Sequence, residues 1–464
     1  MTGAPPAARV APAALARLGV ELRSAGYDET AVRERLRVRS TLIEPDQSTV
    51  ARRRVGADRF SELLRLFLFR EAVAIGALET EGIDLVEREG DSIRSSVAVQ
   101  PWRDALVAHD WLGGMPAQDH VVGASAVTEA LADLTVRRPV ESALDLCTGS
   151  GAQAVLASWH AERVVGVDLN PRALRLAQWT LALSGVDNVE LRTGDVRDAC
   201  SGDRFDLVVA NPPFVVSPDR RWLFRDADAG ISQIVVERLP ELLSEGGFAT
   251  VLCQWPLRPG ERWDEQPRAW VEGGPADAWI VRLPTFEEPL DYAANWNHPL
   301  QAANRDEFER TVDRWVEHFR RKGVVGIVTG AVVLRQREGP TWVRADEAAD
   351  WPAQPVGTAI ERLFEGQTLV SSFPSPAALL DRQVMPMDGF RLDETRAFGT
   401  DGLALVAAQA RGALPLRLRL NRAAVRVLPE LDGGVTLRDV PGAEVALPAI
   451  VELVALGLLR SSSG

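Results

Sequence analysis

Residues 142–154 read SALDLCTGSGAQA, a short apolar run that ends on an acid and then turns through two glycines. A second apolar run, VVGVD at 164–168, also ends on a carboxylate. A third precedes Gly194-Asp195, and a fourth, at 205–210, leads into Asn211-Pro212-Pro213-Phe214. Buried strands that alternate with helices and carry special residues at their carboxyl ends are typical of a doubly wound α/β sheet.

The glycine turn suits a nucleoside ligand. Gly149 and Gly151 lack a Cβ, so the chain can adopt positive φ there and a ligand can approach the backbone. Unpaired N–H groups at the start of the following helix favour a carboxylate or phosphate. Asp168, at the end of the next strand, is placed to accept both hydroxyls of a ribose. These features alone fit a dinucleotide and S-adenosylmethionine equally well.

The Asn-Pro-Pro-Phe sequence favours the second of these cofactors. Two consecutive prolines fix φ and remove two donors, so the backbone is stiff. The Asn211 side-chain oxygen and the Pro212 carbonyl can both accept hydrogen bonds from one planar –NH2 group, and Phe214 offers a flat face for stacking. Holding both N–H bonds orients a poorly nucleophilic nitrogen towards an activated methyl group.

Four motifs resemble those of class I S-adenosylmethionine-dependent methyltransferases: DLCTGSGAQA (145–154), VVGVDLNP (164–171), TGDV (193–196) and NPPF (211–214). More narrowly, they resemble the HemK-like group, whose NPPY or NPPF members modify glutamine side-chain amides or exocyclic amines of adenine or guanine. The resemblance covers roughly residues 119–335. It implies a Rossmann-like, seven-stranded methyltransferase domain with S-adenosyl-L-methionine as its cofactor.

The resemblance also implies the site residues. The catalytic candidates are Asn211, Pro212 and Phe214. The cofactor-binding candidates lie at or just after the ends of the core strands, and they are Asp145, Cys147, Gly149, Gly151, Asp168, Leu169, Asp195, Val196 and Asn211.

Some of these residues have an alternative role. Asp195 would bind the adenine amino group or else cap a helix, and Asp145 would support the glycine loop or the methionine ammonium. His120 and Gly123 precede the first core strand and are candidates for the rim of the pocket. An ordinary loop position explains His120 equally well.

Whole-chain properties limit the class of protein. A chain of 464 residues exceeds one usual core and should hold two or three domains. The net charge of −13 opposes non-specific nucleic-acid binding. Three cysteines in or beside apolar runs fit free thiols in a reducing compartment, and no histidine spacing suggests a metal site. No segment reaches about 18 uninterrupted apolar residues, so we expect a cytoplasmic protein without a membrane span.

We expect three domains, at 1–100, 101–338 and 339–464. In the first, helical patterns and then short strands suggest a winged-helix-like unit. Its helices are expected at 11–25, 29–38, 60–69 and 70–78, and its strands at 83–99. The last is expected to be a small α+β domain, for which a second winged-helix-like unit is one option. Its helices are expected at 358–364, 375–380, 401–410 and 447–459, and a strand at 416–420.

The Arg-rich loop 217–226 has two interpretations. Arg220, Arg221 or Arg225 would meet a phosphate or carboxylate of the substrate, or the loop would be a lid held by local ion pairs. The methyl acceptor also stays open, since a protein glutamine, an RNA base and a small amine or amide all fit the motif. A cofactor-binding regulator without turnover is the alternative from another class. The flanking domains do not match the helical N-terminal domain of release-factor glutamine methyltransferases.

Overall fold

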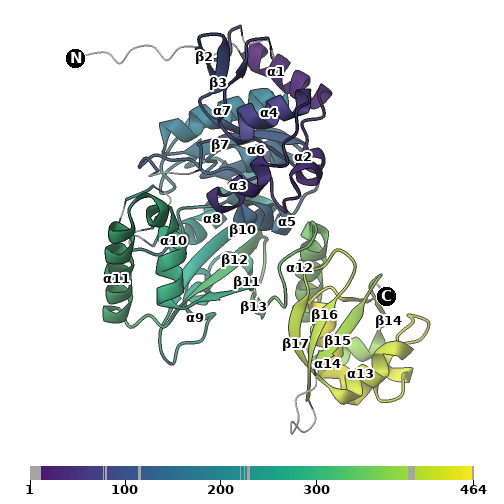
Figure 1. Ribbon diagram of the computed structural model, residues 1–464. Coiled ribbons are helices and arrows are strands. Elements are labelled where there is room, and N and C mark those ends of the chain that lie inside the picture. Colours follow the sequence, from purple (N-terminus) through teal and green to yellow (C-terminus); the bar gives the residue numbers. More distant parts are fainter. Residues whose placement is uncertain are drawn as a thin grey trace.

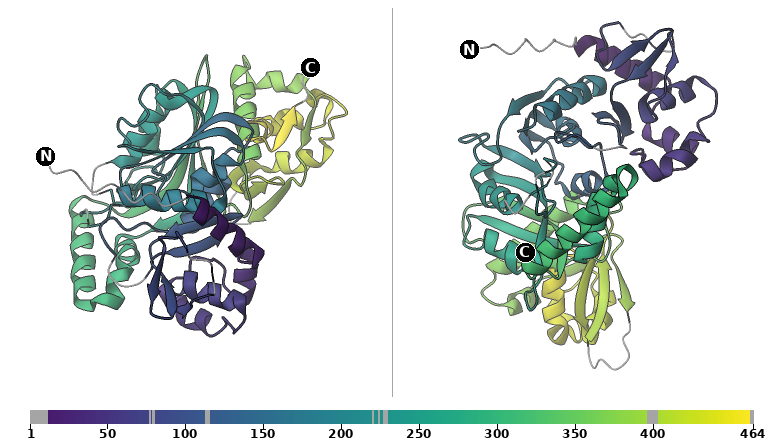
Figure 2. Two further views of the ribbon diagram at one scale, coloured as in Figure 1. Left: turned by 90° about the horizontal axis from the view of Figure 1, so that it is seen from above. Right: turned by 60° about the vertical axis from the view of Figure 1, so that its left-hand side comes forward.

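The computed structural model describes residues 12–76, 78, 81–112, 116–219, 221–223, 225–226, 230–395 and 403–461. A large mixed sheet forms the middle of the molecule, and the N-terminal and C-terminal parts lie at opposite ends of it (Figure 1, Figure 2). Arg220, a candidate substrate contact, lies outside the described residues. Among the helices that are described, none has the length and apolar character needed to cross a bilayer.

The central sheet has the order β13-β11-β12-β10-β9-β6-β7-β8. Its strands are β6 (Val140–Leu146), β7 (Ala161–Asp168), β8 (Val189–Thr193), β9 (Phe205–Ala210), β10 (Leu243–Leu257), β11 (Ala276–Glu287), β12 (Gly326–Gln336) and β13 (Val343–Glu347). Strands β6 to β10 pair in parallel, whereas β12 runs antiparallel to both β10 and β11. The strand order reverses direction at β6 and β9, which is where open α/β sheets bind ligands.

The described sheet has one strand more than the seven expected. Strand β13 pairs in parallel with β11, and Ala278 lies opposite Val343. It follows residue 338, where we expected the methyltransferase domain to end. The three-domain division of the chain stays a prediction, but this strand ties the residues after 338 to the central sheet.

Helices cover both faces of the sheet, namely α5 (Ala126–Leu134), α6 (Ala152–Ser158), α7 (Pro171–Ser184), α8 (Ile231–Leu242) and α9 (Glu265–Val271). Alternate residues of β10 show the two layers, because Phe248 packs with α5 and the C-terminal part while Val251 packs with α8 and α9. The sequence predicts a helix over 171–184, because Pro171 suits a first-turn position, and helix α7 has these bounds. Asn170 accepts the Arg172 N–H at 2.9 Å as its N-cap.

The N-terminal part contains α1 (Pro12–Ser24), α2 (Glu29–Leu36), α3 (Pro45–Arg52) and α4 (Arg59–Leu68), followed by β1 (Val73–Ala74), β2 (Val86–Glu89), β3 (Ser92–Ser95), β4 (Ala98–Trp102) and β5 (Ala105–His109). The helix expected at 60–69 is confirmed as α4, but the second helix expected at 70–78 was wrong, because the described residues there include strand β1. Arg70 follows with φ of 56°, a left-handed conformation that a helix cannot contain. The helical core of this part packs on α7 through Leu176 and Leu183.

A helical hairpin, α10 (Pro289–Ala303) and α11 (Arg305–Arg321), is inserted between β11 and β12 and stands beside the sheet (Figure 1). The C-terminal part contains α12 (Gly357–Ser372), η1 (Pro376–Asp381), β14 (Val384–Pro386), β15 (Arg391–Thr395), β16 (Leu403–Gln409), β17 (Leu416–Asn421), α13 (Arg422–Val427), η2 (Leu428–Glu430), η3 (Leu437–Asp439), α14 (Ala443–Ala455) and β18 (Leu459–Ser461).

The helix expected at 401–410 was wrong, because 403–409 forms β16 in the middle of a three-stranded antiparallel sheet. A short apolar run fits a buried strand and a buried helix equally, and here pairing with β15 and β17 decides. The strand expected at 416–420 is confirmed as β17. The last helix, α14, begins four residues before the predicted 447 and ends at Ala455.

Candidate functional site

Three acids gather at the carboxyl edge of the sheet, after β6, β7 and β8. The carboxylates of Asp168, Asp145 and Asp195 all act on the Cys147 thiol, whose pKa burial and then these charges raise well above its usual value. Cys147 itself has φ of 65°, so the turn after β6 begins in the left-handed region. The residues that the sequence proposed as cofactor ligands therefore lie together, at the point where the strand order reverses.

The two glycines of the turn serve different purposes. Both have positive φ, 55° at Gly149 and 81° at Gly151. A Cβ on Gly151 would lie 3.0 Å from Ala177, so this glycine lets α7 pack closely against the turn. A Cβ on Gly149 would meet nothing nearer than the Cys147 carbonyl at 4.0 Å. Gly149 thus borders open space, as a backbone that a ligand approaches should.

Asp145 is fully buried at the end of β6. Its Oδ2 accepts a hydrogen bond from Thr148 Oγ1 at 2.6 Å, inside the glycine turn. Burial, opposed by that hydrogen bond, raises the pKa of Asp145 to about 7. A cation placed nearby would stabilise the ionised form.

Asp168 holds the turn from the neighbouring strand. Its Oδ2 accepts the Gly149 N–H at 2.8 Å, and its Oδ1 accepts the Asn170 N–H at 2.8 Å. Burial nevertheless raises the pKa of Asp168. Leu169, the next residue, is 59% exposed and adds an apolar surface at the same edge. An acid fixed in this way, beside an exposed apolar side chain, fits the ribose and base of a nucleoside.

Asp195 is held by its own turn. Its Oδ1 accepts the Arg197 N–H at 2.9 Å, and Oδ2 forms an ion pair with the Arg197 guanidinium at 3.0 Å. The described residues after Asp195 form a turn and not a helix, so Asp195 is not the helix cap that was the alternative, and its carboxylate keeps further acceptor positions. Val196 packs partly buried beneath, and its carbonyl accepts Arg238 Nη1 at 2.6 Å.

Asn211 has the property expected of a residue that holds an –NH2 group. Its Oδ1 is buried and has no hydrogen-bond partner among the described residues. An amide oxygen in that state costs free energy, about 1–3 kcal/mol for an unsatisfied buried group. It follows β9 directly, and β9 lies next to β6, so the acceptor is at the same edge as the acids. Pro212 and Pro213 follow it and fix the turn.

Phe214 is packed from the insertion. Its ring is 7% exposed and meets Trp296 of α10 edge-on, with ring centroids 6.3 Å apart. Two residues later, the Val216 N–H donates to Tyr292 Oη at 2.9 Å, and Tyr292 Oη donates to Gln254 Oε1 at 2.6 Å. The chain after the motif is therefore fixed to both α10 and β10. The sequence carried no signal for this contact, because its partners are far apart along the chain.

The described residues of the loop after the motif, 217–226, are held by ion pairs, as the lid interpretation expects. The Arg225 side chain is completely buried, and its guanidinium lies between the indoles of Trp222 (4.1 Å) and Trp315 (4.5 Å). It donates to Asp219 Oδ1 at 2.6 Å and to Asn297 Oδ1 at 2.8 Å. Arg221 pairs with Glu307 of α11 at 2.7 Å. The geometry favours the structural interpretation of Arg221 and Arg225 over contact with a substrate phosphate.

The two rim candidates differ in position. His120 is largely buried, with Nδ1 3.8 Å from Asp110 Oδ2, and burial lowers the pKa of His120. A Cβ on Gly123 would lie 2.6 Å from both Gln100 Oε1 and His109 Cδ2. Gly123 is therefore required for packing against the β4–β5 hairpin. The segment reaches the cofactor edge through Asn170, whose Nδ2 donates to the Asp119 carbonyl at 2.8 Å.

Comparison with known proteins agrees with this arrangement. Residues 119–257 match the methyltransferase small domain family. The ribosomal protein uL3 glutamine methyltransferase of Xanthomonas campestris is 33% identical over 132 residues, which is 25% of this chain and 42% of that protein. The release factor glutamine methyltransferase of Deinococcus radiodurans is 35% identical over 162 residues, 33% of this chain and 58% of that protein.

The chain thus spans about half the length of the curated relatives it matches. Among solved structures, an N-methyltransferase of Haemonchus contortus aligns with 45% of this chain and 52% of its own, at 12% identity and a TM-score of 0.32. The similarity to methyltransferases that the four motifs indicated is confirmed, and the family match lies in the central part of the chain.

Proposed function

We propose that this chain is an S-adenosylmethionine-dependent N-methyltransferase that methylates a planar –NH2 nitrogen held at Asn211-Pro212-Pro213-Phe214. The observation that carries the proposal is the buried Oδ1 of Asn211, which has no hydrogen-bond partner in the described part of the chain and lies beside the edge where Asp145, Asp168 and the glycine turn meet. The family match over residues 119–257 supports the reaction class.

The described residues fit the cofactor. Asp168 would accept the ribose hydroxyls, with Leu169 against the base and Asp195 towards the adenine amino group. Gly149 leaves open space for the methionine part, and ionised Asp145 would attract its ammonium group. When bound, S-adenosylmethionine supplies an electrophilic methyl group.

The chain's own residues prepare the acceptor nitrogen. Asn211 Oδ1 and the Pro212 carbonyl would each accept one N–H bond, which fixes the nitrogen lone pair in direction. The same two acceptors favour positive charge as it develops on nitrogen. Phe214, packed by Trp296, closes one side against water. No strong base is needed, because the proton can leave after methyl transfer.

We propose a glutamine side-chain amide of a protein as the acceptor. The support is that the relatives in Xanthomonas campestris and Deinococcus radiodurans are glutamine methyltransferases of ribosomal protein uL3 and of release factors. A primary amide also presents the two coplanar N–H bonds that two adjacent acceptors require. The net charge of −13 weighs against an RNA acceptor.

Transfer of labelled methyl from S-adenosylmethionine into a fractionated cell extract tests the proposal. We expect label in the protein fraction, recovered as N-methylglutamine after digestion, rather than in RNA or small molecules. Asn211→Ala should abolish the transfer while S-adenosylhomocysteine affinity changes by no more than several-fold. Asn295→Ala is the matched control, because Asn295 is an exposed α10 residue bonded to Glu287.

Three results would contradict the proposal in different ways. Label in RNA or small molecules would contradict the proposed protein acceptor but leave the proposed methyl transfer standing. Equal transfer by Asn211→Ala would remove the role of the motif. Tight cofactor binding without transfer to any fraction would favour the regulator without turnover.

A further inference from the structure

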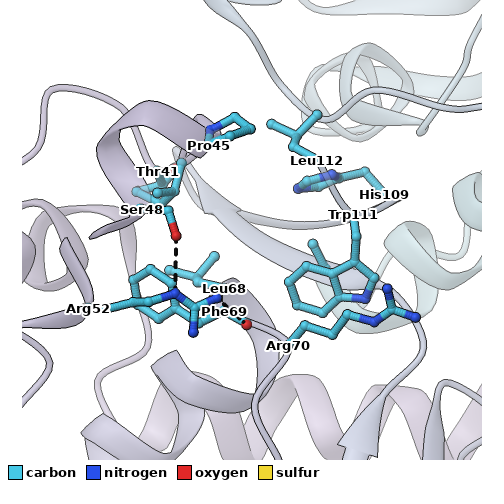
Figure 3. A pocket seen from close by; sticks show the side chains of 12 residues that line it. Thr41, Pro45, Ser48, Arg52, Leu68, Phe69, Arg70, His109, Trp111 and Leu112 are labelled. Carbon is cyan, nitrogen blue, oxygen red and sulfur yellow. Dashed lines mark hydrogen bonds between the residues drawn. The ribbon is translucent and has the colours of Figure 1, made fainter. Parts of the chain in front are cut away.

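The N-terminal part contains a cavity of about 250 Å³ that the methyl-transfer site does not use (Figure 3). Its walls come from the chain around α3 and the end of α4 on one side and from the end of β5 and the residues after it on the other. At about 30 Å³ for each water, this volume corresponds to roughly eight waters. It suits a group the size of one amino-acid residue and is too small for a nucleoside cofactor.

The charged residues that line the cavity are all basic. Arg52 and Arg70 line it, and the described lining contains no acid. Arg52 is already occupied, because it pairs with Glu71 and donates to the Phe69 carbonyl at 2.8 Å. Arg70 differs: among the described residues it forms no direct ion pair, although its charge contributes to lowering the pKa of Glu89, and its side chain runs beside Trp111 (Figure 3).

The backbone of Arg70 is held in a strained conformation beside the cavity. Arg70 has φ of 56°, which costs an L-residue roughly 1–2 kcal/mol relative to the right-handed region. Its carbonyl accepts Arg94 Nη1 at 2.6 Å, so the conformation is fixed from β3. Trp111 Nε1, at the same end, is buried and has no acceptor among the described residues. Two donors are thus available to an anion here.

His109 offers the ligand a hydrogen-bond acceptor, in contrast to the donors of Arg70 and Trp111. Its side chain lines the cavity and is 3% exposed, and burial lowers the pKa of His109 to about 4, so the ring is neutral. Nδ1 is 2.8 Å from the Asp110 carbonyl, so it carries the proton and donates. Nε2 is then an acceptor, with no hydrogen-bond partner found among the described residues. A ligand here needs an N–H donor as well as an anionic group.

Apart from the hydroxyl groups of Thr41 and Ser48, which are bonded to the Pro101 carbonyl and to Arg52 Nε, the rest of the lining is apolar. It includes Ile43, Leu68, Phe69 and Leu112. An anion, an N–H donor and an apolar body within one residue-sized group describe an N-acylated α-amino acid with its carboxylate free. We propose that this cavity binds such a group: Arg70 would meet the carboxylate, His109 Nε2 the amide N–H, and the apolar wall the side chain.

This chemistry has two sources, a free N-acyl amino acid and the carboxyl-terminal residue of a polypeptide. Isothermal titration of the full chain, with S-adenosylhomocysteine present in excess, tests both. The first probe is N-acetyl-L-phenylalanine. The second probe is the primary amide of the same compound, which lacks the carboxylate charge. The third is 3-phenylpropanoate, which lacks the amide N–H. We expect saturable binding of the first probe and at least tenfold weaker binding of the other two.

Two variants locate the binding. Arg70→Gln should weaken N-acetyl-L-phenylalanine at least tenfold, and Ala98→Leu should block it by filling the cavity from β4. Arg53→Gln is the matched control, since Arg53 is exposed at the end of α3 and does not line the cavity. Unchanged melting temperature and S-adenosylhomocysteine affinity would show that the variants are folded.

A second pair of probes separates the sources. Pentaglycyl-phenylalanine with a free carboxyl terminus should bind at least tenfold more tightly than N-acetyl-L-phenylalanine if a polypeptide end is the ligand. Equal affinities would assign the free acyl amino acid. Absence of saturable binding, equal binding of the primary amide, or binding that Arg70→Gln and Ala98→Leu leave intact would overturn the proposal. None of these results depends on methyl transfer.

Discussion

The raised pKa of Asp145 should make both stability and cofactor affinity depend on pH. Because burial raises its pKa to about 7 from an ordinary value of 3.8, the folded chain without cofactor binds a proton that the unfolded chain releases between those values. This contribution to stability is present below pH 4 and declines as pH rises to 7. A ligand ammonium near Asp145 favours the ionised form of the carboxyl. Cofactor affinity should therefore rise with pH, whereas this contribution to stability falls.

We therefore expect S-adenosylhomocysteine affinity to rise roughly tenfold between pH 6 and pH 8, as a group with a pKa near 7 must lose its proton. Titration calorimetry at several pH values measures this. In Asp145→Asn, which cannot ionise, the slope should disappear. A slope that survives the substitution would assign the titration to another group.

The two glycines of the turn give a second test at this scale. Gly151→Ala places a Cβ 3.0 Å from Ala177 at φ of 81°, so both strain and a clash with α7 oppose folding, and we expect a loss of roughly 2–3 kcal/mol. Gly149→Ala has strain alone, roughly 1–2 kcal/mol. Thermal unfolding should rank them in this order.

Cofactor binding should separate the same two variants in the other direction. Gly149→Ala puts its methyl group into the open space before the turn, so S-adenosylhomocysteine affinity should fall at least tenfold. Gly151→Ala points its methyl group at α7 and should bind more nearly as the parent chain does. Equal losses of affinity would show that Gly149 does not border the cofactor.

The sequence could identify site residues at strand ends but not residues that reach the site from distant parts of the chain. Asp145, Gly149, Asp168 and Asn211 sit at strand ends, so their convergence follows from the parallel sheet. Tyr292 and Gln254 act on the chain after the motif from 76 and 38 residues away, as seen in their bonds to Val216 and to each other. Only the folded structure brings them together.

At the scale of elements, the lid and the α10–α11 hairpin form one unit around Arg225. Its guanidinium is buried between two tryptophans and paired with Asp219. Removing one member of a buried pair leaves the other charge uncompensated, at a cost of roughly 3–5 kcal/mol. Arg225→Met should therefore speed amide hydrogen exchange across 215–219 and α10–α11 and lower the melting temperature.

The matched control is Arg221→Met. Arg221 and Glu307 form a pair whose side chains are 28% and 30% exposed, so solvent screens it and its loss should cost under about 1 kcal/mol. If both variants raised exchange equally, the buried pair would not be what holds the lid. If neither did, the hairpin would be anchored by Tyr292 and Gln254 instead.

Element types were predicted well where length or capping was informative. Helix α7 has a proline at its first position, and this residue indicated where the helix begins; Gly185 follows its last turn. Strand β16 was taken for a helix because its run of six apolar residues carries no periodicity that separates a buried strand from a buried helix. Helix α10 went unnoticed because Pro299 lies inside it.

At the scale of the whole molecule, one hydrophobic core links the central sheet to the C-terminal part. Phe248 of β10 packs on Phe364 of α12 with ring centroids 5.2 Å apart, and Trp342 packs on the same ring at 4.8 Å. Arg344 of β13 pairs with Asp346 at 2.7 Å and reaches Glu452 of α14. A boundary at residue 338, which the motif content suggested, would cut through this core.

Two truncated chains test where the central domain ends. A chain that stops at Glu338 lacks β13, so residues 278–282 of β11 become an unpaired edge and Trp279 Nε1 loses its acceptor Asp346. Unpaired edges promote association between chains, so we expect this chain to aggregate on sedimentation analysis. A chain that stops at Asp350 keeps β13. It should be less stable than the full chain but should sediment as a smaller species than the aggregated chain that ends at Glu338. If the chain ending at Glu338 were equally soluble and melted no lower, β13 would be dispensable and the domain would end where the motifs indicated.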